Sequence, residues 1–426
     1  MLPCAQDDTR KTLSPCATKS LPLKALSPVA DEWARRAWVP GYSFVPSDTA
    51  APKVRAMLQD LLNQELDNRL SWASRIDELY GVKVNALSVD ELFELYRRAG
   101  FLYPAKASRL LPYMELVREN WRRLLRAGDS LLYFLTAGGG EKGYASVAVW
   151  RTTGRGWISQ HLVSENNPLA SRAVMLAGSA GALLRGLDES AQNWFRPENR
   201  FPARVFGSMV QSIGESWASV TRHMYFALPR KRLFETNESV QVVPYDPSHH
   251  EALCALAALV RGNLYVTAEE LKYDVELQYV NDLYRGVGLR RTRQVWLAYR
   301  DSNDEPVGTA IAYRGPLGVN FSFIENRCDV LLHPTVPEAE VPGVVASLLN
   351  AAQAAYVDFE LNEIPVIADQ IAASALTGLG AEFLRNYCQG IWLQKGQQHF
   401  YGHVDHFYSR LLQRMVKQNI EPSLIV

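Results

Sequence analysis

The stretch that decides the fold is residues 131–164, LLYFLTAGGGEKGYASVAVWRTTGRGWISQHLVS. It contains three runs rich in β-branched and aromatic residues, 131–136, 144–151 and 156–164, separated by two short glycine-bearing turns. Such runs favour strands, and short glycine-bearing turns join antiparallel strands. The stretch therefore predicts a three-stranded antiparallel meander.

Helical patterns flank this meander on both sides. Apolar residues recur at spacings of three and four over 51–73 and 89–127, which predicts helices there. Ser88 with Glu91 three residues later is typical of a capping box at a helix start. Beyond the meander we expect helices at about 170–186 and 203–219 and a closing strand at 223–228.

The same order of elements returns after the polar stretch 229–239. Strands are expected at 240–244, 294–300, 307–314, 319–332, 363–367 and 389–394, with helices at 248–260, 341–355 and 369–379. Gly143 falls opposite Gly308, and Pro168 opposite Pro334, at spacings of 165 and 166 residues. A constant spacing of matching elements predicts two structurally similar domains produced by duplication.

The expected organisation has five parts. Residues 1–30 form a flexible tail, 31–228 an N-terminal domain with a helical insertion, and 229–239 a linker. Residues 240–396 form a C-terminal domain, and 397–426 a final helix. The fold class is α/β, with two tandem domains of mixed central sheets flanked by helices and a helical N-terminal extension.

The composition excludes several classes of protein. The 426 residues carry 45 Lys and Arg against 45 Asp and Glu, and this zero net charge argues against a general nucleic-acid or anionic-membrane binder. Apolar runs stay below the roughly 18 residues that a membrane span needs. The five scattered cysteines make no zinc framework. We expect a reduced, cytoplasmic protein.

This order of elements resembles that of the GNAT acyltransferase superfamily. Leu332-His333-Pro334, followed by Leu348-Leu349, resembles the end of the family's fourth strand and the helix that opens the acyl-CoA site. Residues 375–383, ALTGLGAEF, resemble its later helix and exit. The resemblance implies a tandem GNAT-like protein that moves an acyl group from acyl-CoA to an amine.

The loops that would hold acyl-CoA depart from the family pattern, which is a glycine-bearing loop at a helix N-terminus. In the second half, loop 335–342 carries two prolines together with Glu338 and Glu340, which would repel a diphosphate. The first-half loop lacks paired glycines but offers polar groups to an anion. The candidate acyl-CoA ligands there are Ser164, Asn166, Asn167, Ser171 and Arg172.

The candidate catalytic residues are His161 and Ser159, which strand alternation places on one face with Trp157. His161 could accept a proton from a bound amine, or it could be a packed core histidine. The family's acidic Tyr is matched by Gln211 and Thr377, neither of which is a proton donor of useful pKa. Two functions stay open: an acyltransferase acting on a small-molecule amine through the first-half cleft, or a catalytically silent module that binds a ligand or a protein partner.

Three further motifs have structural interpretations that we favour. Residues 138–143, GGGEKG, precede a strand, so we expect a hairpin turn and not a phosphate loop. The turn 151–155, RTTGR, is expected to be solvated. His399, His403 and His406 share one helix face among aromatic residues, so we expect a docking helix and no metal.

Overall fold

The computed structural model describes residues 72–185, 190–230, 233–236, 240–300 and 305–417, and two short segments nearer the N-terminus. Those segments, β1 (Leu21–Pro22) and β2 (Phe44–Val45), pair in parallel and belong to the first of the chain's two units, 1–71. All other elements belong to a second unit, 72–426. Nearly all of the predicted tail and of the predicted helix 51–73 lies outside the described residues.

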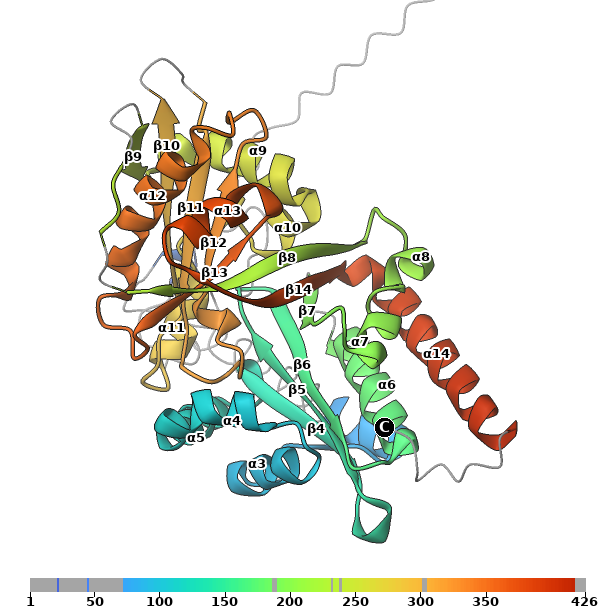
Figure 1. Ribbon diagram of the computed structural model, residues 1–426. Helices are drawn as coiled ribbons and strands as arrows, with labels where there is room; N and C mark the ends of the chain where they lie inside the picture. The colour runs from blue at the N-terminus through green and yellow to red at the C-terminus, as the bar shows by residue number, and fades with distance from the viewer. Residues whose placement is uncertain are drawn as a thin grey trace, which may run out of the picture. The chain divides into compact units, whose positions relative to one another are not determined.

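One twelve-stranded mixed sheet forms the centre of the second unit (Figure 1). From one edge to the other its strands are β3 (Lys83–Val84), β4 (Leu132–Gly138), β5 (Tyr144–Arg151), β6 (Gly156–Ser164), β7 (Ser190–Phe195), β14 (Glu382–Leu393), β8 (Ala218–Pro229), β13 (Glu363–Ala368), β12 (Cys328–Leu332), β11 (Gly308–Arg314), β10 (Thr292–Arg300) and β9 (Val240–Pro244).

The two halves of the sheet repeat the same pairing. β4–β5 and β5–β6 are antiparallel and β6–β7 is parallel. In the second half β10–β11 and β11–β12 are antiparallel and β12–β13 is parallel. The predicted tandem repeat is therefore confirmed at the level of strand order.

The halves exchange their last strands, which the sequence does not predict. β8 is the last strand of the first half in sequence order, but it pairs with β13 of the second half. β14 is the last strand of the second half, and it pairs with β7 of the first half. β8 and β14 also pair with each other, so two expected sheets become one. The exchange gives β7 and β13 the partner that each would otherwise lack, since an unpaired strand edge leaves backbone groups unsatisfied.

Helices cover both faces of the first half (Figure 1). α6 (Pro168–Arg185), α7 (Arg200–Val205), α8 (Met209–Ile213) and α14 (Gln397–Lys417) lie on one face, and α3 (Val89–Arg98), α4 (Pro104–Leu110) and α5 (Met114–Arg126) on the other. Alternation along β4 divides the core accordingly: Tyr133 packs with Val174 of α6, whereas Phe134 packs with Trp121 of α5.

The second half is covered by α9 (His250–Arg261), α10 (Asn263–Ala268), α11 (Gln278–Arg285), α12 (Val341–Ala352) and α13 (Gln370–Gly378). Among the helices described, none combines the length and apolar character needed to cross a membrane.

Most predicted elements are present, with differences where proline or polar residues intervene. The predicted helix 89–127 is three helices, interrupted before Pro104 and Pro112, although its capping box at Ser88 is confirmed. The sequence does not indicate β7, because Ser190-Ala-Gln-Asn lacks a strand pattern, and α10 and α11 are likewise not predicted. The predicted strand 319–332 is regular only over β12.

The turn between β5 and β6 is buried against the second half, so the expectation of a solvated turn is wrong. The backbone N–H groups of Gly154 and Arg155 donate to the Glu270 carboxylate at 3.0 and 2.5 Å. The Arg151 carbonyl accepts from the Tyr284 hydroxyl at 2.7 Å. The other turn, 138–143, is the expected hairpin between β4 and β5.

Candidate functional site

The candidate site lies where β6 and β7 part. These parallel strands pair only between 156–158 and 190–192, and then diverge. Two side-chain amides bridge the opening: Asn193 donates to the Ser159 carbonyl, and Gln160 donates to the Trp194 carbonyl at 2.7 Å. Both amides satisfy backbone carbonyls that would otherwise face a strand gap without a partner.

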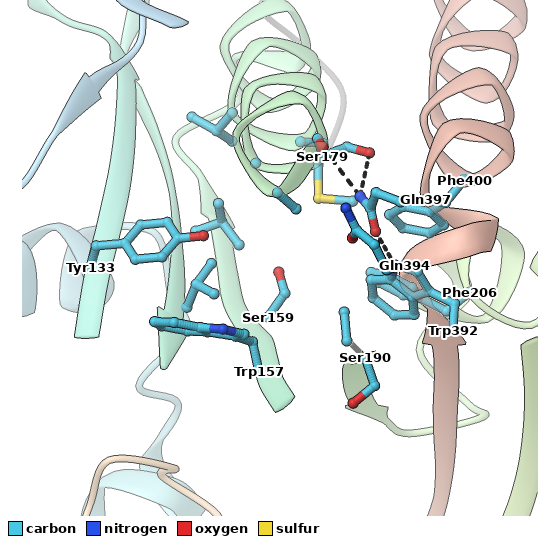
Figure 2. Close-up of a pocket in the computed structure, with 17 residues that line it drawn as sticks. Tyr133, Trp157, Ser159, Ser179, Ser190, Phe206, Trp392, Gln394, Gln397 and Phe400 are labelled. Atoms are coloured by element: carbon cyan, nitrogen blue, oxygen red, sulfur yellow. Dashed lines mark hydrogen bonds between the residues drawn. The ribbon is translucent and has the colours of Figure 1, made fainter. Parts of the chain in front are cut away.

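A cavity of about 50 Å³ lies beside this opening, on the α6 face of the sheet (Figure 2). Figure 2 shows Ser159 of β6 and Ser179 of α6 pointing towards it, with Gln397 and Phe400 of α14 on the far side. Its walls are otherwise mainly apolar and aromatic. The space suits a few water molecules and is too small for an acyl chain with its carrier.

His161 lies on the opposite face from Ser159, so the prediction that they share a face is wrong. Ser146 pairs with Val163 while Ala148 pairs with Gln160, so β6 holds one extra residue here. His161 adopts φ 55° within this bulge. A bulge shifts the alternation of the residues that follow it, and this one turns His161 towards α5.

An aromatic cluster surrounds the His161 imidazole. The ring of Phe321 is 4.3 Å away between centroids, and Trp121 stacks on it at 5.8 Å. Nε2 accepts a long hydrogen bond of 3.5 Å from the Phe321 N–H, and Nδ1 is buried with no partner. Burial, together with the nearby Lys106, holds the pKa of His161 well below its usual range. The imidazole is therefore neutral at pH 7.

Two of the predicted acyl-CoA ligands instead build the start of α6. The Ser164 hydroxyl accepts from the Asn167 N–H and donates to the Asn167 carbonyl, both at 3.1 Å. The Asn167 side chain caps α6 by accepting from the Ala170 N–H at 2.9 Å. Asn166 is exposed at φ 55°. Capping satisfies helix N–H groups that an anion would otherwise use.

The other two predicted ligands, Ser171 and Arg172, contact α14. The hydroxyls of Ser171 and Tyr408 are 2.6 Å apart, and the Arg172 guanidinium is 2.5 Å from the Asp405 carboxylate. The predicted acyl-CoA ligands therefore lie in one loop and the first turn of α6, and α14 packs against Ser171 and Arg172 there. Sequence spacing gives no signal for contacts between residues more than two hundred positions apart.

Buried ion pairs fill the matching strand region of the second half. Arg327 pairs with Asp329 at 2.9 Å and with Glu269 at 3.0 Å, and the Tyr265 hydroxyl donates to Asp329 at 2.9 Å. Glu325 forms a separate pair with Arg291. The two halves thus share a fold but differ in the chemistry around the equivalent strand.

The structure also reveals a basic cluster that no pattern in the sequence predicts. The Tyr103 hydroxyl accepts from Arg385 of β14 at 3.0 Å and from Arg196, just past β7, at 3.5 Å. Lys106 of α4 lies beside them, with Nζ 3.6 Å from the Phe101 ring centroid. Burial, with the charges of both arginines, lowers the pKa of Lys106 to about 7. These residues come from three distant segments, so no local motif marks them.

The histidines of α14 dock the helix. His403 bonds to the Ser212 hydroxyl at 2.8 Å and to the Val205 carbonyl at 2.7 Å, and His399 stacks on Trp217. Within the described ranges, no three His, Cys, Asp or Glu side chains gather as a metal site would require.

The chain is similar to several solved structures. Neither a protein-family profile nor a curated protein matches the chain. An acetyltransferase-like protein from Pyrococcus horikoshii is similar at a TM-score of 0.39 and 11% identity, covering 74% of this chain and 91% of its own. A tandem GNAT protein from the clavulanic acid biosynthesis pathway is similar at 0.37 and 11%, covering 73% and 98%. A GCN5-related N-acetyltransferase from Kribbella flavida is similar at 0.32 and 13%, covering 65% and 95%.

The repeated strand order carries the assignment of the fold. Each half has an antiparallel meander of three strands, followed by a parallel crossover through a helix to the next strand. The described chain from residue 72 onward is therefore a tandem α/β repeat, and its strand order is the one that the sequence resemblance to the GNAT superfamily implies.

Proposed function

We propose that the protein is a GNAT-type acyltransferase whose working site is the opening between β6 and β7. The observation that carries this proposal is the parting of these two strands beside the start of α6 at Pro168. The GNAT resemblance implies that the acyl donor lies between this strand and this helix. The acyl acceptor would then approach from the face covered by α3, α4 and α5.

Lys106 has the properties that a proton acceptor on this face needs. Its pKa of about 7 leaves a large neutral fraction at physiological pH. An amine must lose a proton before its nitrogen can attack an acyl carbonyl, and a base with a pKa near the working pH does this best. The freed amine would attack the thioester carbonyl, and CoA would leave as a thiolate that takes up a proton.

The two catalytic candidates predicted from the sequence, Ser159 and His161, lie on opposite faces of the opening between β6 and β7. Ser159 lines the cavity on the donor face. His161 lies on the acceptor face within the electrostatic influence of Lys106. We propose that His161 has a positioning role, in which it holds the aromatic side chains that line the acceptor face. We also propose that α14 moves away, and that Ser164, Asn166, Asn167, Ser171 and Arg172 then bind the acyl donor.

A catalytically silent module is the second candidate, and one observation favours it. Ser171 and Arg172, the side chains best placed for an anionic donor, already bind Tyr408 and Asp405 of α14. In that case α14 is a permanent part of the first half, and the protein binds a ligand or a protein partner without turnover.

Binding and turnover by the full chain separate these functions. Calorimetry with acetyl-CoA should show saturable binding, and Lys106→Met should keep that binding while lowering turnover of an amine panel by about 100-fold or more. Lys272→Met, which changes an exposed lysine of the second half, is the matched control. Absence of binding to acetyl-CoA and to longer acyl-CoA thioesters would favour the silent module.

A further inference from the structure

The basic cluster around Tyr103 carries positive charge that no neighbouring carboxylate in the described residues neutralises. Arg196, Arg385 and Lys106 converge there, and in the described part of the chain none of them forms an ion pair with a carboxylate. The acidic groups nearby do not change this, because Glu363 is bound by Arg109, and Glu198 is exposed and unpaired with the cluster.

The cluster has donors left over for a ligand. Both guanidinium groups point at one hydroxyl, that of Tyr103, which cannot neutralise them. The Arg385 Nε is buried and has no hydrogen-bond partner, so a donor in this cluster is unsatisfied. A buried unsatisfied donor on a charged group is costly, and an oxyanion is the ligand that two guanidinium groups bind best.

The position of the cluster links it to the opening between β6 and β7. Arg196 directly follows the last residue of β7, and Asn193 of the same strand bridges the opening to Ser159. Lys106 influences His161 on β6. All four basic and aromatic members, Tyr103, Lys106, Arg196 and Arg385, are partly exposed, so solvent reaches them.

From this arrangement we propose that Arg196, Arg385 and Tyr103 bind a carboxylate or phosphate group of the acyl acceptor, so that the acceptor is an amine bearing an acidic group. The assignment of this anion to an acceptor rests on the proposed acyltransferase function. Burial, and after it the charges of Arg196 and Arg385, lower the pKa of Lys106. A bound anion neutralises the contribution of the two arginines, so the neighbouring amine meets a stronger base. The groups that face Lys106 are Arg196, Arg385, Tyr103 and His161.

Inorganic phosphate tests the site directly, without knowledge of the acceptor. Calorimetry on the full chain at pH 7.5, in buffers of different ionisation enthalpy, should show saturable phosphate binding coupled to proton uptake. Arg196→Gln and Arg385→Gln should each weaken phosphate binding at least tenfold, and Lys106→Met should abolish the proton uptake. Arg285→Gln, which alters an exposed arginine of α11, should leave both unchanged. Arg196→Gln keeps the test valid if Arg385→Gln does not fold, because Arg196 lies outside any strand.

The outcomes separate the two proposals. Absence of phosphate binding, or binding that both arginine variants leave unchanged, overturns the anion site. Competition between phosphate and acetyl-CoA overturns its assignment to the acceptor, because the anion would then belong to the donor. In turnover assays, phosphoethanolamine and amino acids should exceed ethanolamine and the matching decarboxylated amines at least tenfold. Phosphate binding without acetyl-CoA binding leaves the anion site standing and defeats the acyltransferase proposal alone.

Discussion

One extra residue in β6 decides which face of the sheet receives His161. Alternation from Trp157 predicts that Ser159 and His161 lie on the same face, and that prediction holds for Ser159 but fails two residues later, at His161 in the bulge. The bulge depends on how β6 pairs with β5, and no pattern within β6 reveals it. The identity of His161 as a candidate could be found in the sequence, whereas its surroundings could not.

The first prediction concerns the buried, neutral His161. The pKa of His161 in the folded protein lies well below 6.5. As the pH falls through about 6.5, His161 therefore becomes protonated in the unfolded chain but stays neutral in the folded protein. This residue should therefore cost up to about 1.4 kcal/mol of stability per pH unit below that point. In His161→Phe the loss of stability between pH 7 and pH 5 should be smaller, as measured by urea unfolding. Equal losses in both proteins would show that His161 is hydrated or protonated in the fold.

The second prediction concerns Lys106, whose effect on stability should vary with pH on the alkaline side of pH 7, whereas that of His161 varies on the acid side. Its pKa falls from an unfolded value near 10.4 to about 7, so the cost of its buried charge is full below pH 7 and fades as pH rises towards 10.4. Lys106→Met should raise the free energy of unfolding by at least about 1 kcal/mol at pH 6, and by much less at pH 10. Thermal or urea unfolding at both pH values measures this. A gain that does not vary with pH would mean that the effect is packing alone.

At the scale of elements, the sequence predicts those whose pattern is local. The meander β4–β5–β6, α6 and α12 follow from period and turns within their own residues. β7 was missed because Ser190, Gln192 and Asn193 are polar, and they are buried only because α10 and β14 cover them. Gln192 bonds to Glu269 and Gln389, which lie far away in the chain. Tertiary contacts, and not propensity, make this strand.

The docking of α14 on α6 yields a prediction about ligand binding. An acyl donor at the start of α6 has to displace the contacts of Asp405 and Tyr408. Asp405→Ala with Tyr408→Phe removes a half-exposed ion pair and a buried hydrogen bond, together about 1 kcal/mol. If α14 covers the donor site, this double variant should bind acetyl-CoA about three- to tenfold more tightly by calorimetry. Arg414→Ala, an exposed change on the same helix, is the control. Weaker binding in the double variant would place α14 among the donor's ligands.

For the whole molecule, the strand exchange determines what can fold independently. A protein of residues 1–236 would carry β8 without β13 and leave β7 without β14, and 237–426 would have the converse defects. The spacing of 165 to 166 residues correctly predicted that the order of strands is repeated, yet similar domains can be joined side by side or by exchange. Spacing within the sequence does not distinguish these arrangements.

The corresponding prediction is that the halves fold only together. Expressed separately, 1–236 and 237–426 should lack a cooperative unfolding transition, because each has unpaired strand edges. Mixed or co-expressed, they should form a one-to-one complex that unfolds cooperatively, as size-exclusion chromatography and circular dichroism can show. The intact chain, nicked by protease at a site inserted within 233–236, is the control. Cooperative unfolding of either piece alone would contradict the obligatory exchange.

The exchange also has a consequence for the protein during its synthesis. β7 leaves the ribosome early, but its neighbour β14 ends at Leu393, close to the end of the chain. At ordinary translation rates the ribosome needs roughly 10–40 s to make the intervening chain. Throughout that interval the nascent first half presents an open sheet edge, and neighbouring nascent chains on one polysome present the same edge to one another. We therefore expect β7 to need protection during synthesis, and slower decoding between the two halves should increase the protein's dependence on ribosome-associated chaperones.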